Sequence, residues 1–324
     1  MSATIRLHAH GGPEVLRLED VPVPKPGPGE ALLRQGAAGV NYRDVYVRKG
    51  IYSGPPLPSG LGFEGAGTVE AIGPGVTAVR PGDRVACVGP DNAYALHRVV
   101  PAERCVVLPA AISDRTAAAM MVRGMTTRYL LFATCRLQRG ETILVTAAAG
   151  GVGLILTQWA KHLGARVIGT VGSAAKLATA KAHGCDEVLV LDGGDFSPRV
   201  RALTGGEGVD IVYDSVGRDT FEASLKSLRP RGSMVVYGTA SGEPDPIAPR
   251  RLNLMGSLHL TYPGLPHYTA SRAELVETAS DLFDVVVSGA VKIEIGQSYP
   301  LAEAAQAHRD LESRNTTGST ILLP

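Results

Sequence analysis

Cysteine is scarce in this chain and lies in no recognisable binding pattern. Cys87, Cys105, Cys135 and Cys185 are spread through 324 residues without a C-x-x-C pair. This spacing supports neither a disulfide framework nor a four-thiolate zinc site. We expect the cysteines to be small buried side chains, with a catalytic cysteine as the alternative.

Long hydrophobic runs and an excess of charge are also missing. No window approaches the roughly 18 uninterrupted apolar residues of a membrane span, and the opening MSATIR lacks the apolar core of a signal peptide. The net charge is +1, the pI is near 7.7, and the basic residues are scattered. We therefore expect a cytoplasmic protein whose main partner is neither a membrane nor a nucleic acid.

The chain has instead two regions of different texture. With 44% hydrophobic and 19% charged residues it has an ordinary globular composition and is long enough for two domains. In the first region, proline-glycine clusters separate short β-rich runs such as 31–35 and 67–72. This texture predicts a β-barrel-like domain.

From residue 142 onward, short apolar strands alternate with helix-patterned stretches. The expected strands are 142–145, 165–170, 187–191, 210–213 and 234–237, with 257–261 as a sixth, and the expected helices are 152–163, 177–183, 198–203 and 221–228. Buried strands that alternate with helices indicate an α/β fold with a parallel, doubly wound sheet.

The pattern changes again after Pro263. We expect a helix at 272–287, a strand near 291–295, a helix at 301–313 and a last strand at 319–323 that returns to the first domain. The predicted domains are thus 1–122 with 264–324, and 123–263.

A glycine-rich turn joins the first strand of the alternating series to its helix. Residues Ala147 to Gly153 read AAAGGVG. Strand, glycine turn and helix in this order seat a dinucleotide pyrophosphate on a helix N-terminus. Gly150 allows the phosphates to approach, Gly151 turns the chain, and Gly153 lets the helix pack closely on the strand. Ala148 stands where the usual G-x-G-x-x-G pattern has its first glycine.

Longer motifs in both regions resemble one enzyme family. The chain reads NYRDVY from Asn41, RKGIY from Arg48, LGFEGAG from Leu61, GVDIVYDSVG from Gly208 and RNTTG from Arg314. With the A-x-x-G-x-x-G turn, it resembles the zinc-independent, zeta-crystallin-like quinone oxidoreductases of the medium-chain dehydrogenase/reductase superfamily. The resemblance spans nearly the whole chain. It implies a GroES-like β-barrel catalytic domain followed by a Rossmann domain.

Two substitutions argue against a catalytic zinc. Zinc alcohol dehydrogenases of this superfamily carry a cysteine near the position of Asn41 and a histidine at that of Phe63. A phenylalanine ring has no lone pair to donate, and an amide oxygen replaces a thiolate poorly. We take His8 and His10 to be surface residues. The prediction is an enzyme without a metal.

The end of the second strand bears on cofactor choice. NAD-preferring folds carry an acid about 20 residues past the glycine turn for the ribose hydroxyls, whereas this chain has no acid between Thr170 and Asp186. Ser173 can donate a hydrogen bond and Lys176 can offer positive charge to a 2′-phosphate. We therefore expect NADPH. The alternative is that Lys176 is simply a solvated helix residue. Family members often carry a tyrosine near the position of Asp192, and the acid found here predicts a weaker preference for NADPH over NADH.

The resemblance implies hydride transfer from NADPH to a quinone in a domain cleft that excludes water. It places Asn41 and Tyr46 beside the nicotinamide and the substrate, and Tyr52 at the pocket rim. Each of the three could donate a hydrogen bond to the developing oxyanion, although Tyr52 could serve packing alone. The expected cofactor contacts are Asn41, Tyr46, Thr126, Gly150, Gly151, Val152, Gly153, Ser173, Lys176, Ser215, Gly238, Thr239, Ser241 and Arg314.

Two other functions stay open at this point. One is NADPH-dependent reduction of an activated carbon-carbon double bond, as in alkenal or enoyl reductases. The other is an NADPH-binding structural or RNA-associated protein. The family also pairs subunits through a strand matching 257–261, which predicts a homodimer.

Overall fold

The computed structural model describes residues 1–313 and 316–324 and contains two compact units. Unit 1 consists of Met1–Met125, Ala270–Val287 and Ile293–Pro324, and unit 2 of Thr126–Thr269 and Ser288–Lys292. The division differs from the expected domains by a few residues at each boundary, and it assigns Ser288–Lys292 to unit 2. One reason is that α2 (Asp114–Tyr129) is continuous, so the first boundary falls inside a helix.

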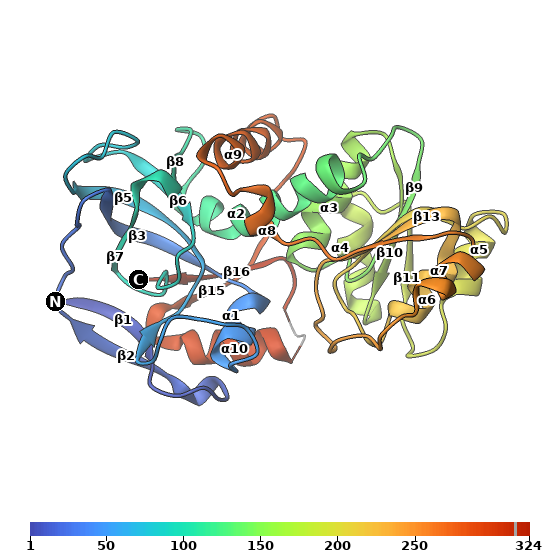
Figure 1. Ribbon diagram of the computed structural model, residues 1–324, viewed down its shortest axis with the longest axis horizontal. Coiled ribbons are helices and arrows are strands. Elements are labelled where there is room, and N and C mark those ends of the chain that lie inside the picture. Colours follow the sequence, from blue (N-terminus) through green and yellow to red (C-terminus); the bar gives the residue numbers. More distant parts are fainter. Residues whose placement is uncertain (314–315) are drawn as a thin grey trace. The chain divides into compact units, whose positions relative to one another are not determined.

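Unit 2 is built on a six-stranded parallel sheet (Figure 1). Its strands are β9 (Thr142–Val145), β10 (Arg166–Val171), β11 (Glu187–Val190), β12 (Val209–Asp214), β13 (Leu228–Val236) and β14 (His259–Thr261). The spatial order is β11-β10-β9-β12-β13-β14. The direction of strand addition reverses between β9 and β12, which is the position where doubly wound folds bind their ligands. This order confirms the predicted Rossmann sheet and its sixth strand.

Helices cover both faces of this sheet, because strands buried on two sides need two apolar layers. In Figure 1, α3 and α4 lie on one side and α5, α6 and α7 on the other. The helices of unit 2 are α3 (Gly151–His162), α4 (Leu177–Ala182), α5 (Ser197–Leu203), α6 (Phe221–Ser227), α7 (Pro249–Leu254) and α8 (Leu265–Tyr268), with a 3₁₀ turn at Ala174–Lys176 and a π-helical turn at Leu130–Thr134. The core between the sheet and α5 and α6 includes Leu144, Val212, Val200 and Phe221.

Unit 1 contains a seven-stranded and a three-stranded sheet. Its strands are β1 (Ser2–Leu7), β2 (Leu16–Val21), β3 (Glu30–Val40), β4 (Ser59–Gly60), β5 (Glu64–Ile72), β6 (Arg84–Val88), β7 (His97–Pro101), β8 (Cys105–Val107), β15 (Ile295–Pro300) and β16 (Ser319–Leu323). The larger sheet has the order β15-β16-β3-β5-β6-β8 with β7 on β3, and the smaller has the order β2-β1-β4. As expected, the last strand returns to the first domain, since β16 pairs with β3.

The helices of unit 1 lie in two separate stretches of the chain. They are α1 (Tyr42–Arg48), most of α2, α9 (Arg272–Val287) and α10 (Ala304–Glu312), with 3₁₀ turns at Pro13–Val15, Ala102–Arg104 and Leu301–Glu303. The prediction of a strand near 291–295 was wrong, because β15 begins only at Ile295. Its residues alternate between half-buried and exposed, and pairing with β16 rather than apolar burial sets its position.

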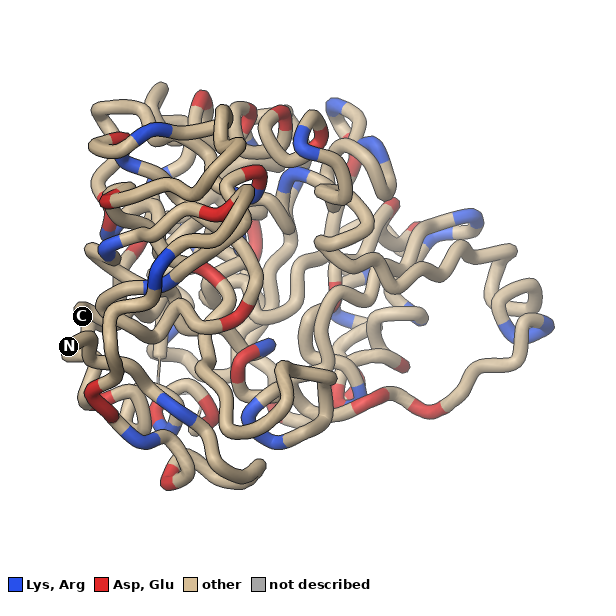
Figure 2. The backbone as a smooth tube through the Cα atoms, turned by 60° about the vertical axis from the view of Figure 1, so that its left-hand side comes forward, with Lys and Arg blue, Asp and Glu red and all other residues tan. Residues whose placement is uncertain are grey.

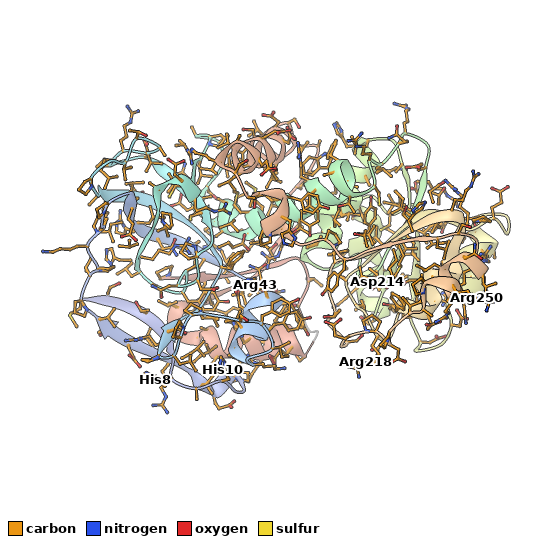
Figure 3. All side chains as sticks on the ribbon, viewed as in Figure 1. His8, His10, Arg43, Asp214, Arg218 and Arg250 are labelled. Carbon is orange, nitrogen blue, oxygen red and sulfur yellow. The ribbon has the colours of Figure 1, made fainter. Side chains whose placement is uncertain are left out.

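Basic and acidic residues are mixed along the described part of the chain (Figure 2). Lysine and arginine are interspersed with aspartate and glutamate along both units (Figure 2). His8 and His10 follow β1 and are exposed (Figure 3). Within the part of the chain that the structure describes, no helix is both long and apolar enough to span a membrane.

Candidate functional site

The glycine turn of unit 2 presents an uncapped helix N-terminus. Gly150 precedes α3 with an extended backbone and no capping side chain, and the first turn of α3 carries no acid. The first N–H groups of an α-helix lack intrahelical acceptors, so they can bind an anion such as a pyrophosphate. Gly151 and Val152 are the first two residues of α3. The turn therefore fits a dinucleotide cofactor.

Gly153 and Gly169 provide the close packing that this turn requires. A Cβ on Gly153 would lie 2.4 Å from the Ala147 carbonyl oxygen and 2.8 Å from the Ala148 backbone. Ala148 is fully buried, and a Cβ on Gly169 of β10 would lie 2.8 Å from its methyl group. The usual motif has a glycine at position 148, which needs no room for a side chain. Here the methyl group of Ala148 is accommodated because Gly169 on the neighbouring strand has no side chain.

The other predicted cofactor residues of unit 2 follow neighbouring strands of the sheet. Ser173 and Lys176 come after β10, Ser215 after β12, and Gly238, Thr239 and Ser241 after β13. The carboxyl ends of parallel strands meet at one edge of a sheet, so these residues share the edge that carries the glycine turn. Ser173 is exposed and Lys176 half-buried. Thr126 is a buried residue of α2 in this unit, and Arg314 lies outside the described residues.

The loops after β12 and β13 are bonded to each other. The Ser241 hydroxyl donates to the Val216 carbonyl at 2.8 Å and accepts from the Asp219 amide at 3.0 Å. The amide of Ala240 donates to the Ser215 carbonyl at 3.2 Å. Ser215 and Ser241 are therefore held in one cross-linked loop pair.

Asp214, at the end of β12, anchors these loops from inside unit 2 (Figure 3). Its carboxylate is fully buried. It accepts hydrogen bonds from the amides of Val216 at 2.8 Å and Gly217 at 3.1 Å. Three hydroxyls also donate to it, those of Thr146, Thr220 and Ser224. One carboxylate thus joins the ends of β9 and β12 to α6.

Replacing Asp214 with asparagine should destabilise unit 2 by about 3 kcal/mol, since the amide cannot accept all of these bonds and leaves buried donors unsatisfied. Calorimetry on the full chain measures the loss. Asp245→Asn, at an exposed position of the same unit, is the control and should change stability by less than about 0.5 kcal/mol. An unchanged melting temperature for Asp214→Asn would refute the anchoring role.

In unit 1, Asn41 is fixed by a buried ion pair. Asn41 precedes α1, and its side-chain Nδ2 donates to Glu64 Oε1 at 2.7 Å. Arg123 of α2 donates to the same oxygen at 3.0 Å, and the Val122 amide donates to Glu64 Oε2 at 2.7 Å. Burial raises the pKa of Glu64, and the charge of Arg123 opposes that rise. The Glu64 carboxyl group therefore sets the orientation of the Asn41 amide.

Gly39 makes room for this arrangement. It pairs with Glu64 across β3 and β5. A Cβ at position 39 would lie 2.2 Å from the Ala118 carbonyl oxygen and 2.4 Å from Glu64 Oε1.

Tyr46 and Tyr52 form an aromatic cluster with Tyr42. The rings of Tyr46 and Tyr52 lie 4.9 Å apart between centroids, and those of Tyr42 and Tyr46 lie 5.7 Å apart. Both the Ile51 and Tyr52 amides donate to the Tyr46 carbonyl, which folds the chain back on the end of α1. The structure thus brings two of the three predicted catalytic residues into contact and places Asn41 at the start of the same helix.

Phe63 packs against a cation. The guanidinium of Arg43 lies 3.8 Å from the centroid of its ring and is held by two hydrogen bonds to Asp91. Throughout residues 1–313 and 316–324, no three His, Cys, Asp or Glu side chains form a group that could hold a metal ion.

A buried series of hydrogen bonds links α1 to α10. Arg48, fully buried, donates from Nη1 to His308 Nδ1 at 2.9 Å. His308 Nε2 lies 3.2 Å from the Tyr94 hydroxyl, which donates to Asp44 Oδ2 at 2.9 Å. Asp44 Oδ2 also accepts from the Asn41 amide at 2.8 Å. The backbone of Asn41 is therefore held from the interior of unit 1.

Glu64, Arg123 and Asp214 were not among the residues predicted for the site. Each had a visible signal, because a charged residue inside or beside an apolar run must find a partner when that run is buried. Arg123 follows AAAMMV and Asp214 ends DIVYD. Their partners could not be inferred, since they lie far away in the sequence.

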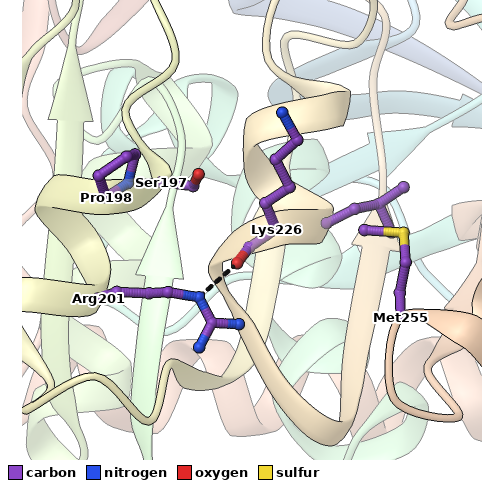
Figure 4. A pocket seen from close by; sticks show the side chains of 6 residues that line it. Ser197, Pro198, Arg201, Lys226 and Met255 are labelled. Carbon is purple, nitrogen blue, oxygen red and sulfur yellow. Dashed lines mark hydrogen bonds between the residues drawn. The ribbon is translucent and has the colours of Figure 1, made fainter.

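A hollow of about 450 Å³ on unit 2 involves none of the predicted residues (Figure 4). It is lined by Ser197, Pro198, Arg201, Leu225, Lys226 and Met255. The guanidinium of Arg201 donates to the carbonyls of Lys226 and Leu228, each at 2.9 Å. Because these carbonyls already use its donors, this hollow is a poorer anion site than the glycine turn.

Two family models match the chain, one in each half. The alcohol dehydrogenase GroES-like domain matches residues 27–134, and the zinc-binding dehydrogenase family matches residues 151–280. The family named for zinc matches a stretch that contains neither Asn41 nor Phe63.

Full-length relatives are also found. The quinone oxidoreductase of Pseudomonas aeruginosa is 47% identical over 100% of both chains, and a 2-haloacrylate reductase of Burkholderia sp is 45% identical over 98% of both. The crystal structure of Escherichia coli quinone oxidoreductase complexed with NADPH matches with a TM-score of 0.97 and 44% identity, covering 99% of this chain and 100% of that one.

Proposed function

Since this chain belongs to the quinone oxidoreductases of the medium-chain dehydrogenase/reductase superfamily, we propose that it transfers a hydride from NADPH to a quinone without a metal ion. The observation that carries this function is the match over essentially the whole chain, in both units, to a quinone oxidoreductase complexed with NADPH. The uncapped start of α3, with its packed glycine turn, supports the cofactor independently.

The residues at the sheet edge of unit 2 would hold the cofactor. We assign the pyrophosphate to the first N–H groups of α3, from Gly151 to Gly153, and the 2′-phosphate to Ser173 and Lys176. Ser215, Gly238, Thr239 and Ser241 follow β12 and β13 at the same edge, and Thr126 is assigned to the carboxamide. Arg314 remains a prediction from the sequence.

When bound, NADPH supplies a hydride from C4 of its nicotinamide to the acceptor. Asn41 would donate its second amide N–H to the acceptor oxygen, because its first is committed to Glu64. Tyr46 and Tyr52 carry hydroxyl groups that can do the same. A quinone oxygen that gains negative charge is stabilised by such fixed donors.

Loss of NADPH absorbance against a panel of 1,4-benzoquinone, 9,10-phenanthrenequinone and 2-alkenals tests the function. We expect quinones to be turned over fastest. Faster turnover of the alkenals would favour double-bond reduction, which the similarity to a 2-haloacrylate reductase makes the second candidate. NADPH binding without turnover of any acceptor would contradict the enzymatic function.

Replacing Lys176 with glutamate should raise the dissociation constant for NADPH by roughly 10- to 100-fold and leave that for NADH little changed. The reason is that a charge-assisted bond to the 2′-phosphate contributes about 1.5–3 kcal/mol. Isothermal titration with both nucleotides measures the two constants. Lys181→Glu, at an exposed position of α4, is the matched control. Equal weakening of both nucleotides would rule out the phosphate contact.

We also propose a homodimer joined through β14. This strand is the last in the sheet of unit 2, so among the described residues one of its edges has no neighbouring strand. Leu254 and Tyr262 on either side are 72% and 52% exposed. Light scattering that gives a monomer mass at micromolar concentration would refute this. The cytoplasmic location stays a prediction from the sequence.

A further inference from the structure

Two cysteines of unit 1 face each other across neighbouring antiparallel strands. Cys87 of β6 and Cys105 of β8 are direct partners in the strand register. Direct partners in an antiparallel pair have Cα atoms about 4.5–5.5 Å apart and side chains on the same face. A disulfide spans Cα separations of about 4.4–6.8 Å. The two sulfurs can therefore bond without movement of the strands relative to each other.

A buried cation lies beside the pair, while the Cys87 thiol donates a hydrogen bond to the Gly89 carbonyl at 3.0 Å. Both cysteines are fully buried, and Arg98 of β7 is fully buried as well. Arg98 donates from Nη2 to the Cys87 carbonyl at 3.2 Å, while its Nε and Nη1 have no hydrogen-bond partner. A buried guanidinium with unused donors needs an anion, because an unpaired charge in the interior is costly.

The chemistry of the two sulfurs is consequently unequal. A hydrogen bond from Cys105 lowers the pKa of Cys87 to about 6; burial opposes this shift, and the charges of Arg98 and Arg104 reinforce it. The same hydrogen bond and burial raise the pKa of Cys105. One sulfur is thus suited to attack an oxidant, and the other stays protonated beside it.

We propose that Cys87 and Cys105 form a reversible dithiol–disulfide pair that is oxidised by hydroperoxides. The Cys87 sulfur attacks the peroxide and breaks its O–O bond, which leaves a sulfenic acid and, for hydrogen peroxide, one water. The Cys105 sulfur then displaces the hydroxyl group, which leaves as a second water with the Cys105 proton. In sum, two thiols lose two electrons and two protons, and one hydrogen peroxide becomes two waters. An external thiol reverses the reaction by exchange.

An oxidant can reach the pair through the edge of the sheet. β8 has three residues and is the end strand of the larger sheet, where β6 is its one partner among residues 1–313 and 316–324. Val107 at its end is 49% exposed. A short edge strand of this kind opens locally at far lower free energy than the whole domain, and its opening exposes both sulfurs.

The test is to treat the full-length protein with hydrogen peroxide, alkylate the remaining thiols in denaturant, digest the chain and identify the peptides by mass spectrometry. We expect a linked peptide pair containing Cys87 and Cys105 that disappears on treatment with dithiothreitol. The half-buried Cys135 serves as the internal reference thiol. In Cys105→Ser the sulfenic acid of Cys87 should persist and be trapped by dimedone, whereas Cys185→Ser should behave like the wild type.

Arg98→Met should slow the oxidation of Cys87 by about tenfold at neutral pH, because less of the thiol is ionised. The inference is overturned if Cys87 and Cys105 both remain alkylatable after exposure that oxidises Cys135, or if the linked peptides join other cysteines. The wild-type result does not require any variant to fold. It also uses neither NADPH nor quinone, so it stands or fails separately from the proposed function.

Discussion

Replacing Gly153 with valine should weaken NADPH binding by roughly 100-fold or more. Even a Cβ at this position would meet the Ala147 carbonyl oxygen at 2.4 Å, and that oxygen belongs to the backbone of the turn. Overpacking of such a contact costs about 1–3 kcal/mol, and each 1.4 kcal/mol is tenfold in affinity. The extra methyl groups of valine place the effect at the upper end. Titration of NADPH into the purified variant measures it.

The matched control for this variant is Gly264→Val in the same unit. A Cβ on Gly264 would meet nothing closer than 3.8 Å. We expect native affinity in the control and a circular dichroism spectrum close to that of the wild type in both variants. If Gly153→Val binds NADPH normally, the glycine turn is not the pyrophosphate site.

Replacing Glu64 with alanine should lower the stability of unit 1 by about 3–5 kcal/mol, because it leaves the Arg123 guanidinium buried without its anionic partner. Arg123 is only 6% exposed. The same change removes the acceptor of the Asn41 amide, so the rate of quinone reduction should fall along with stability. Calorimetry and the quinone assay on the same preparation give both values.

Glu70 provides the control for Glu64, because it lies at the other end of β5. Its bond to Arg34 is an exposed one, with side chains 36% and 58% accessible, so Glu70→Ala should cost less than about 1 kcal/mol. The double variant Glu64→Leu with Arg123→Leu should recover most of the stability and none of the activity. Recovery of activity in the double variant would show that Glu64 does not act through Asn41.

The fold of unit 2 was accessible from sequence because its determinants are local. Buried parallel strands appear as short apolar runs, and β9 and β12 are of this kind. The glycine turn was accessible for the same reason, since its residues are consecutive. The reason that alanine is tolerated at position 148 could be seen only in the structure, because Gly169 on another strand leaves room for its methyl group.

The environment of Asn41 could be predicted only in part. The resemblance pointed to Asn41 itself, but Glu64 reaches it through strand pairing and Arg123 through a helix distant in the sequence. β15 was misplaced for a related reason: it is held by pairing with β16, and half-exposed strands leave little hydrophobic pattern. Contacts that depend on register between distant segments leave no mark in a single sequence.

The series from Arg48 to Asp44 has a consequence for proton exchange on folding. Arginine can only donate, so His308 accepts at Nδ1 and carries its proton on Nε2, and the Tyr94 proton points to Asp44. Burial and the charge of Arg48 lower the pKa of His308 from 6.5 to about 3, while burial raises that of Asp44 from 3.8 to about 7.

The two shifts act on stability with opposite signs. The contribution of His308 to the stability of unit 1 falls as pH falls from 6.5 toward 3. The contribution of Asp44 falls as pH rises from 3.8 toward 7. Between about pH 4 and 6.5 the unfolded pair holds one proton on the histidine, and the folded pair holds one on the carboxyl. Folding therefore relocates a proton without taking one from solvent, and this network makes the stability of unit 1 insensitive to mild acid.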